Sequence, residues 1–256
     1  MTGMPAKLRL LPLLFAAIAA AAALSGFAPV PAEGAETAVV LTVDGVIGPA
    51  AADYIERGLN EARARHAGLV VLQLDTPGGL DSAMRDIIRA ILASPVPVAS
   101  FVSPSGARAA SAGTYILYAS HIAAMAPGTN LGAATPVQLF GFSPPLPEPP
   151  PKPNGAAHQD AKSPPAASGE EPSRDVMTIK LTNDAVAYIR SLAALRGRNA
   201  DWAEQAVRNA VSLPADQAVS QGVVDFIASD IPELLAKANG RKVMLGGRAV
   251  TLATAG

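Results

Sequence analysis

A serine in a crowded segment of small residues is the first group of this chain that could do chemistry. Ser111 lies within GARAASAGTYILYASH, at the junction of a strand-like and a helix-like stretch. A hydroxyl there, with the amide of Ala112 beside it, could attack a carbonyl group and help to hold it. The alternative is that Ser111 only caps the helix that follows, a common role for serine at such a position.

Two consecutive glycines could complete a site for acyl transfer. Gly78 and Gly79 end the segment DTPGG, where they can adopt positive φ and turn backbone amides toward a ligand. The helix predicted to begin just after them attracts negative charge at its N-terminus. The pair therefore predicts half of an oxyanion hole, and an ordinary tight turn is the alternative.

A serine nucleophile needs a base, and no histidine of the chain lies in a suitable context. His66 ends a polar helix, His121 lies at a helix-to-strand junction, and His158 lies in a Pro-rich stretch. Lysine can serve instead when burial leaves it neutral. Among the lysines, Lys180 in VMTIKLTNDAVAYIRSLAAL has apolar neighbours on both sides and is expected to be partly buried. The alternative is a solvated lysine at a helix end.

The elements that must position these residues alternate between strand and helix. The predicted order is a strand at Ala38–Ile47, a helix from Pro49, a strand at Leu69–Asp75, a helix at Leu80–Ser94 and a strand at Val96–Val102. This βαβαβ order predicts an α/β fold with parallel strands and crossover helices. Ligands of such folds bind at the carboxyl ends of the strands, where both unusual loops are placed.

The sequence after Lys180 predicts several shorter elements. They are a helix that ends at a Gly-Arg-Asn turn, a helix capped by Asn199 or Asp201, a short helix from Ser212, a strand at Val223–Ala228 and a hairpin around Gly246-Gly247. Asp216 and Asp225 are expected to be capping and surface residues.

Five motifs in order resemble those of the NfeD (nodulation efficiency protein D) family of membrane-bound serine proteases. They are TPGG, AASAGTYI, HIAAMAPGTNLGAATP, KLTNDAVAYIRSLAALRGRNADWAE and SLPADQAVSQGVVDFIASDIPELL. The resemblance runs from about Ala38 to about Leu252 and implies the ClpP/crotonase-like fold.

The resemblance also implies the roles of the site residues. It makes Ser111 the nucleophile and Lys180 the general base of a Ser-Lys dyad, with the oxyanion region at Gly78, Gly79 and Ala112. Such a protease requires no metal or organic cofactor.

The substrate implied by the resemblance is a hydrophobic peptide or membrane protein, with a stomatin-like protein as the leading class. Two rivals are a noncatalytic scaffold that binds a stomatin-like partner and a crotonase-type acyl-CoA enzyme. The pairing of Ser111 with Lys180 argues against the second rival. A homodimer or higher oligomer is expected because related folds oligomerise.

The charged and apolar N-terminus indicates the location of the protein, and a later Pro-rich stretch divides its main domain. Lys7 and Arg9 precede the apolar run Leu10–Leu24, so residues 1–35 predict a signal peptide or N-terminal membrane anchor. With the family resemblance, this predicts that residues 36–256 are a ClpP-like serine protease domain, exported or membrane-associated on the extracytoplasmic side. A Pro-rich stretch at about 139–175 predicts a disordered insert and a candidate lid.

Composition excludes several other classes. The net charge is −1 and there is no basic stripe, which argues against a nucleic-acid partner. Cysteine is absent, so disulfides, cysteine zinc sites and a cysteine nucleophile are excluded.

Overall fold

The structure is a computed structural model that describes residues 37–137 and 174–254. The predicted signal or anchor at 1–35 and the predicted disordered insert, as far as residue 173, lie outside the described residues.

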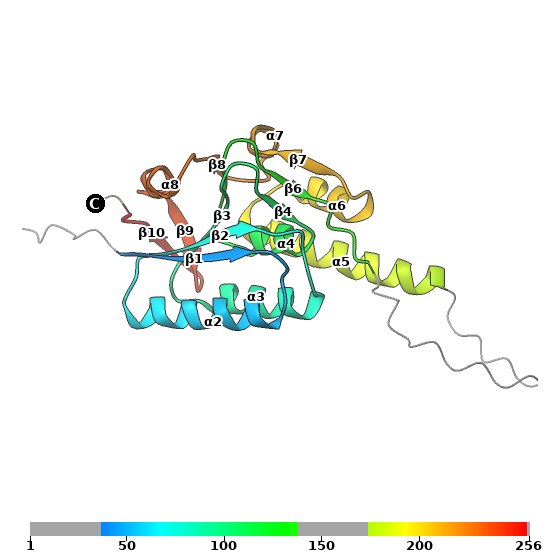
Figure 1. Cartoon of the computed structure of the whole chain (residues 1–256), viewed down its shortest axis with the longest axis horizontal. Coiled ribbons are helices and arrows are strands. Elements are labelled where there is room, and N and C mark those ends of the chain that lie inside the picture. The colour runs from blue at the N-terminus through cyan, green and yellow to red at the C-terminus, as the bar shows by residue number, and fades with distance from the viewer. Residues whose placement is uncertain (1–36, 138–173, 255–256) are drawn as a thin grey trace, which may run out of the picture. The chain divides into compact units, whose positions relative to one another are not determined.

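A five-stranded parallel sheet lies at the centre of the fold (Figure 1). Its order is β1-β2-β3-β5-β8, and each neighbouring pair is parallel. The strands are β1 (Ala38–Asp44), β2 (Leu69–Asp75), β3 (Val98–Val102), β5 (Ile122–Met125) and β8 (Phe226–Ile227). Strands β2 and β3 are nearly continuous apolar runs because central parallel strands are covered on both faces.

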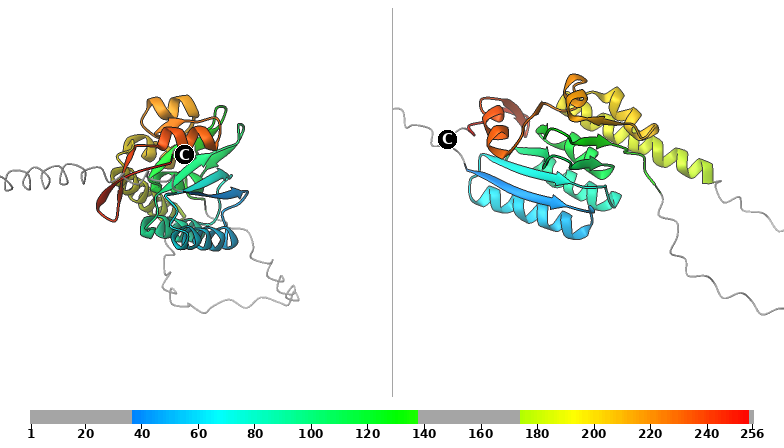
Figure 2. Two further views of the ribbon diagram at one scale, coloured as in Figure 1. Left: turned by 90° about the vertical axis from the view of Figure 1, so that its left-hand side faces the viewer. Right: turned by 45° about the horizontal axis from the view of Figure 1, so that its top comes forward.

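Different elements cover the two faces of this sheet (Figures 1 and 2). They are α2 (Pro49–Ala64) and α3 (Asp81–Ala93) on one face, and α8 (Ile231–Ala238) with the hairpin β9 (Lys242–Leu245) and β10 (Arg248–Thr251) on the other. Leu72 belongs to the first apolar cluster, while Val71 and Phe101 belong to the second. The two clusters form because successive strand residues point to opposite faces.

A second sheet of three strands supports the loops at the carboxyl ends of the main strands. It contains β4 (Arg108–Ala110), β6 (Asn130–Gly132) and β7 (Ser212–Pro214), in the order β4-β6-β7. Three further helices lie in the second half of the chain: α5 (Arg174–Arg196), α6 (Ala200–Arg208) and α7 (Ala215–Ser220).

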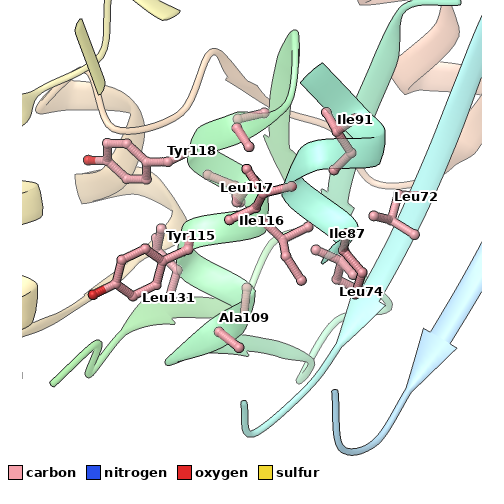
Figure 3. Close-up of a cluster of buried hydrophobic side chains, with 14 of the residues drawn as sticks. Leu72, Leu74, Ile87, Ile91, Ala109, Tyr115, Ile116, Leu117, Tyr118 and Leu131 are labelled. Atoms are coloured by element: carbon pink, nitrogen blue, oxygen red, sulfur yellow. The ribbon is translucent and has the colours of Figure 1, made fainter. Parts of the chain in front are cut away.

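Helix α4 (Ala112–Ala119) is buried along its whole length. Figure 3 shows its Ile116 and Leu117 side chains toward α3 and β2, and its two tyrosines on the opposite side. Tyr118 stacks on Trp202 with 6.2 Å between ring centroids. Tyr115 stacks in the same way on the ring of Tyr188. The helix therefore joins the main sheet layer to helices α5 and α6.

Two arginines, Arg196 at the end of α5 and Arg198 in the turn that follows, satisfy the C-terminal end of α4. The Nε atom of Arg196 donates to the Ala119 carbonyl at 2.7 Å. The Nη1 atom of Arg198 donates to the carbonyls of Tyr118 and Ser120 at 3.1 and 2.9 Å. Burial and the neighbouring charge of Arg198 lower the pKa of Arg196 to about 10. Cations at this end also suit the helix dipole.

Most predicted elements are confirmed. The βαβαβ order is present, Asn199 is the N-cap of α6 with its side chain accepting from the Trp202 amide at 2.8 Å, and the hairpin turns at Gly246-Gly247. The prediction of a helix from Ser212 is wrong. Residues Ser212–Pro214 pair with β6 as β7, and the helix begins only at Ala215.

The prediction that Asp225 is a capping or surface residue is also wrong. Its Oδ2 atom accepts from the Ala123 amide at 2.7 Å and lies 3.0 Å from Nη2 of the buried Arg198. The carboxylate thus links β5 to the arginine that caps α4. Asp216 is exposed in the first turn of α7, as expected.

Replacing Arg198 by Met should destabilise the fold. The change removes the arginine donor of the Tyr118 and Ser120 carbonyls and the charged partner of Asp225, and breaking a buried ion pair from one side typically costs about 3 kcal/mol or more. Urea unfolding of the Arg198→Met variant measures this loss. Arg57→Met is the control, because the Arg57–Asp53 pair is exposed and should contribute less than about 1 kcal/mol. Equal stability of the two variants would contradict the role given to Arg198.

Candidate active site

Ser111 occupies the N-cap position of α4 but does not cap it. Its backbone has φ 51° and ψ −115°, a conformation rare for a non-glycine residue, and its side chain makes no capping hydrogen bond. The interpretation of this serine as an ordinary helix cap is therefore wrong. Strained backbone of this kind persists only where the surroundings impose it, and it is concentrated at functional sites.

Hydrogen bonds on both sides impose this conformation. The Ser111 amide donates to the Gly132 carbonyl at 2.9 Å, and the Ala110 amide donates to the Thr76 carbonyl at 3.0 Å. The hydroxyl of Thr114 donates to the Gly132 carbonyl at 3.0 Å. Strands β4 and β6 and the end of β2 thus fix the backbone at the serine.

Gly78 and Gly79 form a close backbone contact with this segment. Gly78 has φ +114°, and a Cβ atom there would lie 2.6 Å from Cβ of Ser111. A Cβ atom at Gly79 would lie 2.0 Å from the carbonyl oxygen of Ile47. No side chain fits at either position, which explains the paired glycines.

The amides near Ser111 differ in their availability. The Gly78 amide donates to Oγ1 of the buried Thr76 at 3.0 Å. By contrast, the amides of Gly79 and Ala112 have no acceptor among residues 37–137 and 174–254. Ala112 is the first residue of α4, and Gly79 lies two residues before α3. Both residues line one cavity with Ser111, so their N–H groups can donate to an oxygen atom that develops negative charge there.

Two hollows meet at Ser111. A cavity of about 90 Å³ is lined by Met84, Tyr115 and Ala185 together with the serine. A second hollow of about 430 Å³ lies over the Gly78–Gly79 loop, with Val46, Leu80 and Val137 among its lining residues. The larger hollow is therefore mainly apolar, whereas the smaller one also has the charged side chains of Asp81 and Arg85 in its wall.

Lys180 lies in the second turn of α5 and is exposed. The expectation that it is partly buried is wrong, because its apolar neighbours Ile179 and Leu181 are themselves 57% and 37% exposed. The first buried residue of α5 among those whose side chains are described is Ala185, which lines the same cavity as Ser111. Lys180 thus stands little more than one helical turn from the wall of that cavity.

Neither histidine of the described residues is placed to serve Ser111 as a base. His121 lies between α4 and β5, where its Nδ1 atom accepts from the Val98 amide at 3.1 Å. Burial, with a smaller effect from the charges of Arg196 and Arg198, lowers the pKa of His121 to about 3. His66 is exposed after the end of α2, and His158 lies outside the described residues.

Sequence reasoning missed two residues of this site. Thr76 positions the Gly78 amide, and its only sequence signal is its place directly before PGG. Arg85 lines the cavity at Ser111 and pairs with Asp184 of α5 at 2.6 Å. No local pattern indicates this pair, because 99 residues separate its members.

Neither a metal site nor a membrane-spanning helix is found in the described part of the chain. No three His, Asp or Glu side chains there are grouped so as to hold a metal ion. None of the helices described there combines the length and the apolar character needed to cross a bilayer.

Comparisons with known proteins show similarity to proteins named as membrane-bound proteases. Residues 37–143 match the family model described as NfeD1b, N-terminal domain. The chain is 40% identical over 202 residues to the membrane-bound protease PH1510 of Pyrococcus horikoshii. This match covers 78% of the chain but 40% of that protein, so the chain spans less than half of the relative's length.

Two solved structures show the same fold. A serine-to-alanine mutant of the 1510-N membrane-bound stomatin-specific protease matches with a TM-score of 0.70 and 36% identity, over 86% of this chain and 94% of that one. A lysine-to-alanine mutant of the same protease, in complex with a substrate peptide, matches with a TM-score of 0.70 and 37% identity, over 87% and 90%. These matches confirm the predicted ClpP-like α/β fold.

Gly78→Ala should disable the site more than it destabilises the fold. The added methyl group would displace Ser111, and a displacement of about 1 Å at a reacting group can cost about 100-fold in rate. The rate at which a fluorophosphonate labels Ser111 measures this effect. Gly106→Ala is the matched control, since Gly106 also has positive φ (+94°) but has open space around it. Equal labelling rates in the two variants would contradict the close-contact argument.

The buried His121 should make stability depend on pH. Its folded pKa lies below the ordinary value of 6.5, so the unfolded chain binds a proton between about pH 6.5 and pH 3 that the folded chain does not. Stability therefore falls as pH decreases through this window. Between about pH 6 and pH 4 the parent should lose about 2 kcal/mol more than His121→Asn. Urea unfolding at both pH values tests this, and parallel losses would refute it.

Proposed function

We propose that this chain, which belongs to the NfeD family, is a serine endopeptidase that cleaves hydrophobic segments of a stomatin-like membrane protein. The observation that carries the proposal is the strained, uncapped Ser111 in one cavity with Gly79 and Ala112, whose amides have no acceptor among the described residues. The relatives support it, since they are named stomatin-specific proteases and their solved structures include a serine mutant and a lysine mutant.

The proposed reaction is acyl transfer through Ser111. Lys180, as the neutral amine, accepts the hydroxyl proton while Oγ attacks the peptide carbonyl. The amides of Gly79 and Ala112 donate to the oxyanion. The proton then passes to the leaving amine, and water releases the acyl group from the serine. Gly78, whose amide is already engaged by Thr76, shapes the loop in this scheme.

The base requires a bound substrate in this proposal. Lys180 is exposed in the described structure, and a lysine acts as a base only in its neutral form. An apolar segment lying across α5 and the serine would remove water from the amine, which favours that form. Binding and activation of the base would then occur together.

Apolar side chains around the site support a hydrophobic substrate. Val46, Leu80 and Val137 surround the serine and are 68%, 41% and 78% exposed. Met177 and Ile179 are two further exposed apolar residues, in the first two turns of α5. Exposed apolar groups gathered in this way are typical of surfaces that bind apolar segments.

The remaining parts of the proposal concern location and assembly. Residues 36–256 form the protease domain, on the extracytoplasmic side of a membrane to which residues 1–35 direct or anchor it. The names of the relatives, which call them membrane-bound, support the association with a membrane. The enzyme uses no cofactor and acts as a homodimer or higher oligomer.

Substitution of either member of the dyad should abolish cleavage. The purified chain is incubated with apolar peptides and the products are identified by mass spectrometry. Ser111→Ala and Lys180→Ala should each lower the rate by at least about 1,000-fold, because such residues act as a unit. Ser105→Ala and Lys237→Ala are controls at an exposed loop serine and at a lysine paired with Glu233. An inert parent that still binds the peptides would favour the noncatalytic scaffold.

A further inference from the structure

We propose that Arg85 is a positioning residue that holds the helix carrying Lys180 against the loop of Gly78 and Gly79. This inference rests on the proposed function, because it gives Arg85 a role in placing the base of that reaction. Arg85 takes no proton and touches no reacting atom in this scheme. It acts through Lys180.

The guanidinium of Arg85 joins three side chains. Its Nε atom lies 2.8 Å from Oδ2 of Asp81, and its Nη2 atom lies 2.6 Å from Oδ2 of Asp184. Its central carbon lies 4.5 Å from the centre of the Tyr188 ring. A planar group with donors on two edges suits such a bridge, whereas the single ammonium of a lysine could not reproduce it.

Each of these contacts leads to one part of the proposed machinery. Asp81 is the first residue of α3 and lies two positions after Gly79. Asp184 lies one turn after Lys180 on α5, so the two side chains share a face of that helix. Arg85 therefore connects the loop that carries the oxyanion amide to the helix face that carries the base.

The aromatic contact adds the helix of the nucleophile. Tyr188 stacks on Tyr115 with 6.2 Å between ring centroids. Tyr115 follows Ser111 by one turn on α4. The three helices α3, α4 and α5 thus meet around the Arg85 side chain, which is 30% exposed.

The way in which α5 is attached makes the Arg85–Asp184 pair important for the placement of Lys180. Residues Val176, Met177, Ile179 and Leu181 are between 37% and 57% exposed, so apolar burial does not fix this end of the helix. Near Asp184, by contrast, α5 is attached by its pair with Arg85, by Nη1 of Arg208, which lies 3.2 Å from Oδ1 of Asn183, and by the burial of Ala185 and Val186. Asp184 lies one turn from Lys180, so its pair with Arg85 fixes the direction in which this face of α5 points.

The first experiment measures the rate at which a fluorophosphonate labels Ser111. Arg85→Gln and Asp184→Asn should each slow labelling by about tenfold, and Arg85→Lys should restore only part of the rate. Adding Arg85→Gln to Lys180→Ala should cause no further loss, because Arg85 acts through the lysine. Arg57→Gln, which removes an exposed ion pair of α2, is the control and should label like the parent. Parent-like labelling of Arg85→Gln, or a further loss in the Lys180→Ala background, would overturn the proposal.

The second experiment tests whether positions 111 and 180 lie close together, with a readout that does not depend on catalysis. The chain has no cysteine, so Ser111→Cys with Lys180→Cys introduces two unique thiols. A short bifunctional maleimide should join them within one chain, and Arg85→Gln should slow this crosslink by about fivefold or more while Arg57→Gln should not. Failure to crosslink, or equal rates with and without Arg85→Gln, would overturn the positioning role. If the crosslink depends on Arg85 but the parent chain, with Ser111 and Lys180 intact, neither reacts with fluorophosphonate nor cleaves peptides, the positioning is supported and the proposed function is refuted.

Discussion

The complete burial of α4 is the constraint on which the rest of this structure depends. A buried helix cannot leave its terminal carbonyls and amides to solvent, so each end needs a partner. Arg196 and Arg198 supply donors at the C-terminal end. At the other end, the Ala112 amide faces a small cavity beside Ser111. The burial of α4 is thus met by two arginines at its C-terminal end. At its N-terminal end it leaves the Ala112 N–H able to donate to a bound anion.

The nucleophile segment is held by backbone contacts. Bonds from Ala110 to Thr76 and from Ser111 to Gly132 keep the serine in its strained conformation. Gly78 packs directly against it, at a distance that leaves no room for a side chain. Groups fixed in this way need little rearrangement when charge develops on a bound carbonyl, which is the basis of electrostatic catalysis.

The start of the helix that carries the proposed base is held by weaker means. From Ala185 onward α5 is packed into the core, but its first turns, which carry Lys180, expose Ile179 and Leu181 and precede the ion pair of Asp184 with Arg85. Elements with few buried apolar contacts open more readily than the core. In the proposed mechanism this part of the site is the one that a substrate can reorganise, while the serine and its amides stay fixed.

The sequence by itself determined the βαβαβ order, the paired glycines and the unusual serine, because hydrophobic periodicity and glycine conformation are local properties. It also excluded His66 and His121 as convincing bases, and the hydrogen bond from Val98 now explains why His121 is unsuitable. Only the tertiary structure decided that Ser111 does not cap its helix, because Gly132 engages its backbone from another strand. Likewise, the exposure of Lys180, the strand at Ser212–Pro214 and the pairing of Asp225 with Arg198 depend on contacts between distant segments. Local sequence patterns report which face of an element is apolar, but they do not report what packs against that face.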